Sequence, residues 1–379
     1  MKEYQTIIIG AGPAGLIAGR NLNDFLILDK KSKIGEPVQC GEGISAGALK
    51  NQQIELKDNW VNCQIHRVKR VMPNGKCIGR RQQDPLGYII DRTVFEKYLA
   101  EPIIDKIKLG CEVEGLEFID GYWQVFTKNR ESFKGKYLIG ADGFDSVVRR
   151  VVFPENHDKM KFYPAIEYLV ETEKELDCSE IEMFFDNNKY PEGYPWIFPK
   201  SKNTANIGIG GRNIKMSDFQ DFLEKNVKPK YGKYLLLTNK SGVVPIAGPS
   251  VTVFKNNTFL LGDAAGLADP FVKGGMYQAM VSAKIASGCI LENQTHDYRT
   301  RLQSVRLLNK KAYKASQIFY SFSKEVFNEL GEILENRGTS YLKSFSGVRA
   351  LLSKPNLRKN VSNLFTFLKT WWENSDYLW

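Results

Sequence analysis

Three glycines near the N-terminus have the spacing of a phosphate-binding turn. Gly10, Gly12 and Gly15 follow the uncharged, mostly β-branched run at residues 6–9 and precede a stretch compatible with a helix. In this order the first glycine allows a tight turn, the second lets a pyrophosphate approach the backbone, and the third lets the helix pack closely on the strand. The N-terminus of such a helix adds unpaired N–H donors and a positive dipole end.

An acidic residue ends the next apolar run. Residues 25–28 read Phe-Leu-Ile-Leu and lead directly into Asp29, where the ribose hydroxyls of a dinucleotide need an acceptor. This context makes the glycine motif specific, and a glycine-rich turn in an unrelated α/β protein is the alternative. The loop at residues 34–45 is too rich in glycine and proline for a helix and can lie along a bound dinucleotide. Its Cys40 is either close to the reaction centre or a small buried filler.

Two more charged residues follow strand-like segments. Arg92 begins a helical segment and could reach a phosphate or a ribose, although most single arginines lie on the surface. Asp142 stands between small residues after the apolar run at 137–139. The carboxyl ends of strands border the ligand crevice of open α/β sheets, so Asp142 is expected there.

A third glycine-rich stretch occupies residues 257–279, read as a strand, an acidic turn, a loop and a long helix. Asp263 is placed to bind a polyol hydroxyl, and the helix opening at Gly274 directs its positive end into the site. A reduced flavin needs such an end, because its N1 region becomes anionic.

Aromatic residues gather between these motifs. Residues 163–244 alternate as strands and predict an antiparallel sheet with one face toward a cavity. Tyr194, Trp196 and Phe198 lie between prolines in this region. They are either core residues or the wall of a site for an apolar or aromatic substrate.

Length and composition set the frame for these motifs. The chain of 379 residues predicts two domains with an appendage. Its apolar fraction of 42% and the lack of a membrane-length apolar run predict a soluble protein, and we expect no signal peptide. Six scattered cysteines without a C-x-x-C pair, and three histidines, argue against a zinc site or a disulfide framework. We therefore expect a cytoplasmic protein without a metal.

The positive charge is concentrated at the C-terminal end. Residues 299–379 contain fourteen Lys and Arg against six Asp and Glu, which accounts for +8 of the net charge of +10. An apolar helical stripe is predicted there from Val361, Leu364, Phe365, Leu368, Trp371 and Trp372. Tryptophans on a basic amphipathic helix favour an anionic membrane surface over nucleic acid. The alternative is that the stripe packs on the protein itself.

The stretches 10–15, 140–143 and 262–266, in that order, resemble the FAD-binding signature of the para-hydroxybenzoate hydroxylase fold. Within that fold, the segments 37–43, 195–200 and 206–210 resemble the geranylgeranyl reductase family. The resemblance spans roughly residues 1–300. It implies an α/β protein, α+β overall, with a Rossmann-like FAD-binding domain, an antiparallel-sheet substrate domain and a helical C-terminal region. We assign 1–65, 88–155 and 250–297 to the first, 66–87 and 156–249 to the second, and 298–379 to the third.

This resemblance implies a set of site residues. The FAD-binding residues are expected to be Gly10, Gly12, Pro13, Ala14, Gly15, Asp29, Lys30, Cys40, Gly41, Arg92, Asp142, Gly143, Gly262, Asp263, Gly274, Gly275 and Met276. The substrate-binding residues are expected to be Tyr194, Trp196, Phe198 and Pro270, and the catalytic candidates are Cys40, Lys273 and Trp196. Lys273 replaces the first of three glycines usual in the family. Its charge either raises the reduction potential of the flavin or points to water.

The resemblance also implies the chemistry. Family members reduce isolated C=C bonds of polyprenyl chains, with hydride from flavin N5 to one carbon and a proton to the other. The electron donor is open between NADPH and a small ferredoxin-type protein. One alternative is a flavin monooxygenase or halogenase of the same fold, acting on an aromatic or apolar substrate. Another is a non-catalytic flavoprotein that binds a membrane or a partner.

Overall fold

The computed structural model, which describes residues 2–374, has a mixed α/β fold with a helical C-terminal region, as the sequence predicts. It divides into two units, Met1–Val38, Arg92–Phe162 and Val244–Lys310 in the first, and Gln39–Asp91, Tyr163–Val243 and Lys311–Trp379 in the second. Residues 39–65 and the tail thus pack with the second unit, whereas the functional division made from the sequence stays a prediction. The last five residues of the predicted C-terminal region lie outside the described part.

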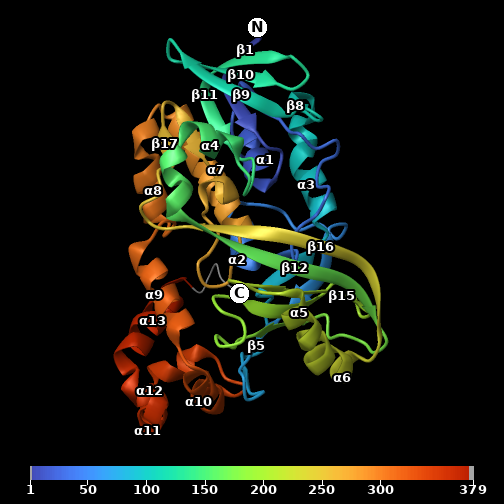
Figure 1. Cartoon of the computed structure of the whole chain (residues 1–379), viewed down its shortest axis with the longest axis vertical. Coiled ribbons are helices and arrows are strands. Elements are labelled where there is room, and N and C mark those ends of the chain that lie inside the picture. The colour runs from blue at the N-terminus through green and yellow to red at the C-terminus, as the bar shows by residue number, and fades with distance from the viewer. Residues whose placement is uncertain (1, 375–379) are drawn as a thin grey trace. The chain divides into compact units, whose positions relative to one another are not determined.

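The first unit contains a sheet with parallel central strands (Figure 1). Its strands are β1 (Lys2–Ile9), β2 (Phe25–Leu28), β8 (Ile107–Lys108), β9 (Val113–Ile119), β10 (Tyr122–Thr127), β11 (Ser132–Gly140), β17 (Phe254–Lys255) and β18 (Thr258–Leu260). The order is β17-β18-β11-β1-β2-β8, and β10 and β9 extend antiparallel from β11. β1 pairs parallel with both β11 and β2. Central parallel strands are buried on both faces, which explains their uninterrupted apolar runs.

The helices of this unit include α1 (Pro13–Arg20), α3 (Arg92–Ala100), α4 (Val147–Val152), α7 (Met276–Leu291) and α8 (Tyr298–Ser304). Of these, α1, α4 and α7 follow the parallel strands β1, β11 and β18 along the chain. α1 and α7 lie side by side, and the Ser287 hydroxyl of α7 donates to the Ala18 carbonyl of α1 at 3.2 Å (Figure 1). The first motif and the third are therefore held together.

The second unit contains the predicted aromatic sheet. Its strands are β5 (Arg67–Val71), β6 (Cys77–Ile78), β12 (Met160–Thr172), β13 (Glu180–Phe184), β14 (Tyr194–Pro199), β15 (Thr204–Gly210) and β16 (Tyr234–Ala247), and the first residues of β12 and the last of β16 belong to the first unit. β12, β15, β14 and β13 pair antiparallel in that order, while β13 and β5 pair parallel. A small antiparallel sheet consists of β3 (Gly43–Ser45), β7 (Gly87–Ile90) and β4 (Val61–Ile65), in that order. Helix α2 (Ala46–Asn51) lies between β3 and β4 in the sequence.

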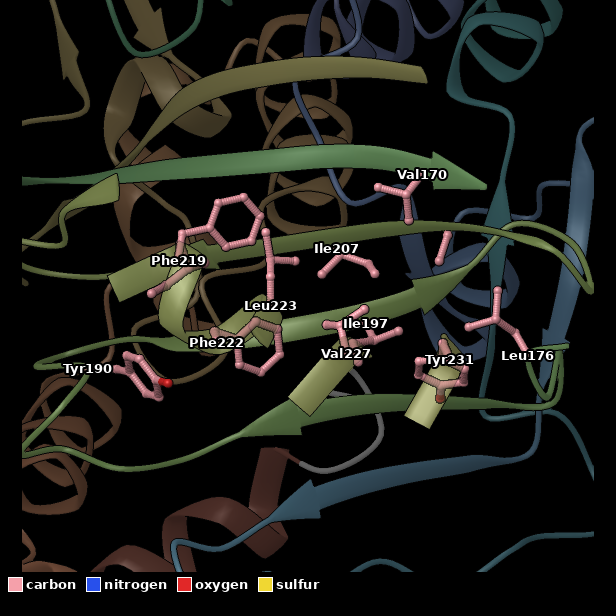
Figure 2. Packing of buried hydrophobic residues seen from close by; sticks show 12 residues of the cluster. Val170, Leu176, Tyr190, Ile197, Ile207, Phe219, Phe222, Leu223, Val227 and Tyr231 are labelled. Atoms are coloured by element: carbon pink, nitrogen blue, oxygen red, sulfur yellow. The ribbon is translucent and has the colours of Figure 1, made fainter. Parts of the chain in front are cut away.

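The two faces of the aromatic sheet differ. Figure 2 shows Val170, Ile197 and Ile207 packed in one cluster with residues of α5 (Met216–Phe222), a π-helical turn (Leu223–Val227) and α6 (Lys228–Tyr231). Side chains alternate along a strand, so the neighbours of these residues face the opposite side. That opposite face carries Trp196 and Asn206, and we call it the site face.

The tail forms helices α9 (Lys310–Ser321), α10 (Lys324–Leu334), α11 (Phe345–Ser353), α12 (Pro355–Lys359) and α13 (Val361–Asn374). Leu364 and Leu368 of α13 are buried, and the Phe367 ring stacks on Phe319 of α9 with 5.0 Å between centroids. The guanidinium of Arg70 lies 5.1 Å from the centroid of Trp371. The buried members of the stripe thus pack within the second unit, whereas Phe365, another predicted member, is 38% exposed.

None of the described helices is both long and apolar enough to cross a membrane.

Candidate functional site

The three glycine-rich motifs meet at the carboxyl ends of adjacent parallel strands β1, β11 and β18. The Ala141 amide donates to the Ile9 carbonyl at 2.8 Å, and the Leu261 amide donates to the Gly140 carbonyl at 2.9 Å. Gly10 has φ of +106°, and a Cβ there would lie 2.2 Å from the Ala141 carbonyl oxygen. Only a residue without a side chain fits this crossing of the first two motifs.

The first motif forms a cradle at the start of α1. A Cβ on Gly15 would lie 1.8 Å from the Gly10 carbonyl oxygen, whereas a Cβ on Gly12 would meet nothing within 4 Å. Gly12 is the N-cap of α1, and no side chain caps the helix. The first-turn N–H groups begin at Ala14, because Pro13 has none, and no side chain caps them. Together with the open space at Gly12, this is what a pyrophosphate site requires.

Asp29 ties the cradle to the end of β2. Its Oδ2 accepts from the Ala11 amide at 2.5 Å and its Oδ1 from the Lys31 amide at 2.8 Å. The carboxylate is buried but keeps lone pairs that can accept ribose hydroxyls. Lys30, the next residue, is exposed.

Asp263 lies close to two arginines. Burial raises its pKa to about 6, and the charges of Arg92 and Arg149 oppose this rise. Within residues 2–374 its carboxylate accepts no hydrogen bond. It lies close to the start of α7, because a Cβ on Gly275 would be 3.0 Å from its Oδ1. Gly262, before it, has φ of +48° and faces Ala279 of α7. A partly buried carboxylate of this kind suits the hydroxyls of a polyol ligand.

Arg149 was missed by the sequence reasoning. Its guanidinium donates to the carbonyls of Ala264, at 3.0 Å, and Phe144, at 2.5 Å, and is 7% exposed as a residue. It therefore links the second motif to the third. The run Val-Val-Arg-Arg after a strand-end aspartate was the only available signal, and such a run also suits a surface helix.

The start of α7 contains the departure from the glycine pattern. Gly275 is the N-cap of α7 without a side-chain cap, and Gly274 and Met276 flank it. Lys273 has φ of +59°, a left-handed conformation that favours glycine, and its ammonium donates to the Pro270 carbonyl at 2.9 Å. Pro270 thus lies beside Lys273 in the first unit, whereas the other three predicted substrate residues belong to the second.

Asp142 is engaged by the start of a helix. Its Oδ2 accepts from the Val148 amide of α4 at 3.2 Å, and burial raises the pKa of its carboxyl. Gly143 has φ of +77°, with open space where a Cβ would be. Asp142 therefore has a clear structural task, and a contact with the cofactor stays a prediction.

The aromatic residues form a row on the site face of the second unit. The ring centroids of Tyr194 and Trp196 are 6.2 Å apart, and those of Trp196 and Phe198 are 6.3 Å apart. A Cβ on Gly208 would lie 2.3 Å from the indole of Trp196, so this glycine provides the slot in which the ring lies. The three side chains can form a continuous apolar wall.

The Cys40 loop borders this row. A Cβ on Gly41 would lie 3.1 Å from the ring of Phe198, and the Asn206 amide nitrogen is 3.4 Å from the Gly41 carbonyl. The Glu42 amide donates to the sulfur of Cys40 at 3.3 Å. The structure thus brings Cys40 and Gly41 together with Phe198 within one unit.

The first unit fits FAD on these observations. It combines an open glycine cradle, an uncapped helix start on each of α1 and α7, a buried carboxylate after β2 and a partly buried one after β18. No cluster of three or more potential metal ligands occurs among the described side chains.

Comparisons with known proteins agree with these features. The family model described as "Geranylgeranyl reductase catalytic domain" matches residues 162–244. Digeranylgeranylglycerophospholipid reductase 1 of Methanococcoides burtonii is 32% identical over 298 residues, covering 73% of this chain and 72% of its own.

Solved structures share the fold. The geranylgeranyl bacteriochlorophyll reductase-like protein of Thermoplasma acidophilum has a TM-score of 0.80 at 23% identity and covers 96% of this chain and 100% of its own. A halogenase variant solved in complex with FAD has a TM-score of 0.67 at 14% identity, covering 98% and 85%. At these identities the likeness shows the fold, while the M. burtonii relative shows the family. This chain is therefore an oxidoreductase that belongs to the geranylgeranyl reductase family.

Proposed function

We propose that this protein reduces isolated C=C bonds of a polyprenyl lipid of the geranylgeranyl type. The observation that carries the proposal is the aromatic row on the site face, inside the matched region 162–244. A polyprenyl chain offers no polar group for recognition, so a site for it must rely on apolar contact and shape. The relative from M. burtonii is named for reduction of such a lipid.

FAD is the cofactor in this proposal. Its pyrophosphate would be held by the cradle of Gly10, Gly12 and Gly15, its adenosine ribose by Asp29, and its ribityl side by Asp263. When bound and reduced, FAD supplies the hydride for the alkene. Arg92 and Arg149 would then balance the charge of Asp263, as they do in the present structure.

The remaining catalytic task falls on positioning. An isolated alkene develops no oxyanion that hydrogen-bond donors could stabilise, so the protein must hold the bond in place and exclude water. The row of Tyr194, Trp196 and Phe198 would form a rigid apolar wall for the polyprenyl chain. Cys40 is the catalytic candidate beside this wall. Lys273 would add positive charge near the start of α7 and raise the reduction potential of the flavin.

We also propose that the helical tail binds an anionic membrane surface, although through α11 rather than α13. Phe345 is 85% exposed, the highest value among the exposed large apolar residues of the described chain, and Leu352 follows two turns later at 44%. Lys343 and Arg349 accompany them, both exposed. Exposed apolar side chains among basic ones fit the interface of anionic lipids. Phe345→Ser should reduce cosedimentation with phosphatidylglycerol vesicles, while unchanged cosedimentation would refute this assignment.

An anaerobic reaction tests the enzymatic proposal. The purified flavoprotein is reduced with dithionite, NADPH or a reduced ferredoxin, and mixed with a geranylgeranyl lipid in detergent. Flavin reoxidation with a gain of two mass units per reduced bond is expected. A flavin that stays reduced until air is admitted, and then hydroxylates or halogenates a substrate, would overturn the proposal in favour of oxygen chemistry.

A further inference from the structure

Two buried glutamates and two partly buried lysines lie together on the site face of the second unit. Glu42 precedes β3, Glu167 belongs to β12, Lys200 follows β14 and Lys240 belongs to β16. The side chains of the two glutamates are 2% and 6% exposed, and those of the two lysines 19% and 17%. No such cluster is needed to bind an apolar chain.

The charges form a continuous series. The Lys200 ammonium lies 2.7 Å from Oε2 of Glu42. The same oxygen lies 4.0 Å from the Lys240 ammonium. The Lys240 ammonium in turn lies 3.3 Å from Oε1 of Glu167. The Asn206 amide also donates to Glu42, at 2.7 Å. Donors and acceptors alternate along the series, from a partly exposed lysine to a buried carboxyl.

The series ends at the aromatic row. Oε2 of Glu167 accepts from Nε1 of Trp196 at 3.1 Å. A Cβ on Gly41 would lie 3.4 Å from the same oxygen. Glu167 is therefore next to both the indole wall and the Cys40 loop.

We propose that Glu167, recharged through Lys240, Glu42 and Lys200, is the relay that brings the proton consumed by alkene reduction. The inference rests on the proposed function. In the reaction the C=C π bond breaks. One carbon gains the hydride, and the other gains the proton of the Glu167 carboxyl group, which becomes a carboxylate. Lys240 returns a proton to Glu167, and Lys200 supplies one to Glu42. Glu42 passes it to Lys240 when side-chain motion shortens their 4.0 Å separation to a hydrogen bond, and Lys200 takes its replacement from water.

The electrostatics support a proton on Glu167. Burial raises the pKa of its carboxyl, and the negative charge of Glu42 acts in the same direction. Lys240 from β16 and the Trp196 N–H from β14 oppose the rise. A carboxyl whose pKa is raised toward the working pH exchanges protons more readily than a fully ionised one.

Two matched variants test the relay. Glu167→Gln keeps the shape and an acceptor for Trp196 but carries no transferable proton. Glu182→Gln is the control, because Glu182 is also buried in this sheet, on β13, and pairs with Lys230. Alkene-dependent reoxidation of the dithionite-reduced flavin is measured across pH. We expect Glu167→Gln to be slower by roughly a hundredfold at unchanged KM, and to lose the ionisation seen in the wild-type profile. Glu182→Gln should keep the wild-type rate and the wild-type pH profile.

A second readout is independent of turnover. In flavin-free protein, infrared difference spectra over a pH titration should show a protonated carboxyl band that is missing in Glu167→Gln. Glu167→Asp should recover part of the rate, because it still carries a proton, whereas a purely structural role predicts no gain over Gln. A Glu167→Gln enzyme with the wild-type rate and pH profile would overturn the relay alone. A wild-type enzyme that reduces no alkene would overturn the proposed function and the relay with it.

Discussion

A Cβ on Gly10 would overlap the carbonyl oxygen of Ala141 at 2.2 Å, so the first and second motifs touch at a point where no side chain fits. Gly12, two residues later, has a φ of −83° and open space around it. The two glycines therefore have different tasks, one in the fold and one in ligand access.

This difference makes a prediction for alanine substitutions. Gly10→Ala should lower the free energy of unfolding by about 1–3 kcal/mol or more, because backbone atoms must move. Gly12→Ala should leave the melting temperature of flavin-free protein unchanged, yet weaken FAD binding by at least about tenfold, since the methyl group fills the pyrophosphate space. Flavin fluorescence titration and calorimetry measure the two effects. Wild-type FAD affinity in Gly12→Ala would place the pyrophosphate elsewhere.

Two substitutions of Lys273 distinguish the effect of its backbone strain from the effect of its charge. Lys273→Gly should stabilise the protein by about 1 kcal/mol, because glycine adopts φ of +59° without the Cβ penalty. Lys273→Ala keeps that penalty and removes only the ammonium. Both variants should lower the flavin reduction potential, measured by dye equilibration, because positive charge stabilises the reduced anionic flavin. An unchanged potential in both would mean that the ammonium serves only Pro270.

Asp263 predicts a pH dependence of flavin-free protein. Its pKa of about 6 in the folded state lies above the ordinary value of an unfolded chain, so protonation favours folding. This contribution is fully present below about pH 4 and is lost as the pH rises through about 6, with a total on the order of 2–3 kcal/mol. Urea denaturation of wild type and Asp263→Asn between these pH values measures it. Parallel stability curves for the two proteins would contradict the assignment.

Gly208 and Gly210 form a matched pair in β15. A Cβ on Gly208 would lie 2.3 Å from the Trp196 indole, whereas a Cβ on Gly210 would lie 3.5 Å from its nearest neighbours. Gly208→Ala should therefore displace the indole, cost about 1–3 kcal/mol and raise the KM for the alkene. Gly210→Ala should keep the wild-type near-ultraviolet circular dichroism and KM. Equal effects of both substitutions would argue against the slot.

The tail gives a test of its packing. Leu364→Ala should cost about 2–5 kcal/mol, because Leu364 is fully buried, whereas Phe365→Ala should change stability by less than about 0.5 kcal/mol. Neither should reduce binding to anionic vesicles if α11 provides the contact. Loss of vesicle binding in Phe365→Ala with intact folding would return that role to α13.

Local signals predicted much of the fold. Asn74-Gly75 and Asp120-Gly121 are dipeptides typical of hairpin turns, and the structure has the hairpins β5–β6 and β9–β10 at these positions, with positive φ at Gly75, Asp120 and Gly121. These turns depend on residues adjacent in sequence. The order of the three glycine motifs was likewise enough to predict that they meet, because each follows its own parallel strand of one sheet.

Long-range relationships were not predictable in this way. Glu42, Glu167, Lys200 and Lys240 come from four segments, and strand alternation indicates only a face, not which charges meet on it. The packing of α13 was left open for the same reason, because an amphipathic stripe does not name its partner. Arg149 was missed because nothing local separates it from its exposed neighbour Arg150.

With Glu167 ionised, the series of two buried carboxylates and two partly buried ammonium groups is electrically neutral, and a proton on Glu167 leaves it with one positive charge. Losing any one member leaves an uncompensated charge inside the unit, which is far costlier than losing a pair. We therefore expect single substitutions at these four positions to be rarer among relatives than paired ones. Among relatives, positions 42 and 200 should change together, and positions 167 and 240 likewise, even where the surrounding sequence has diverged.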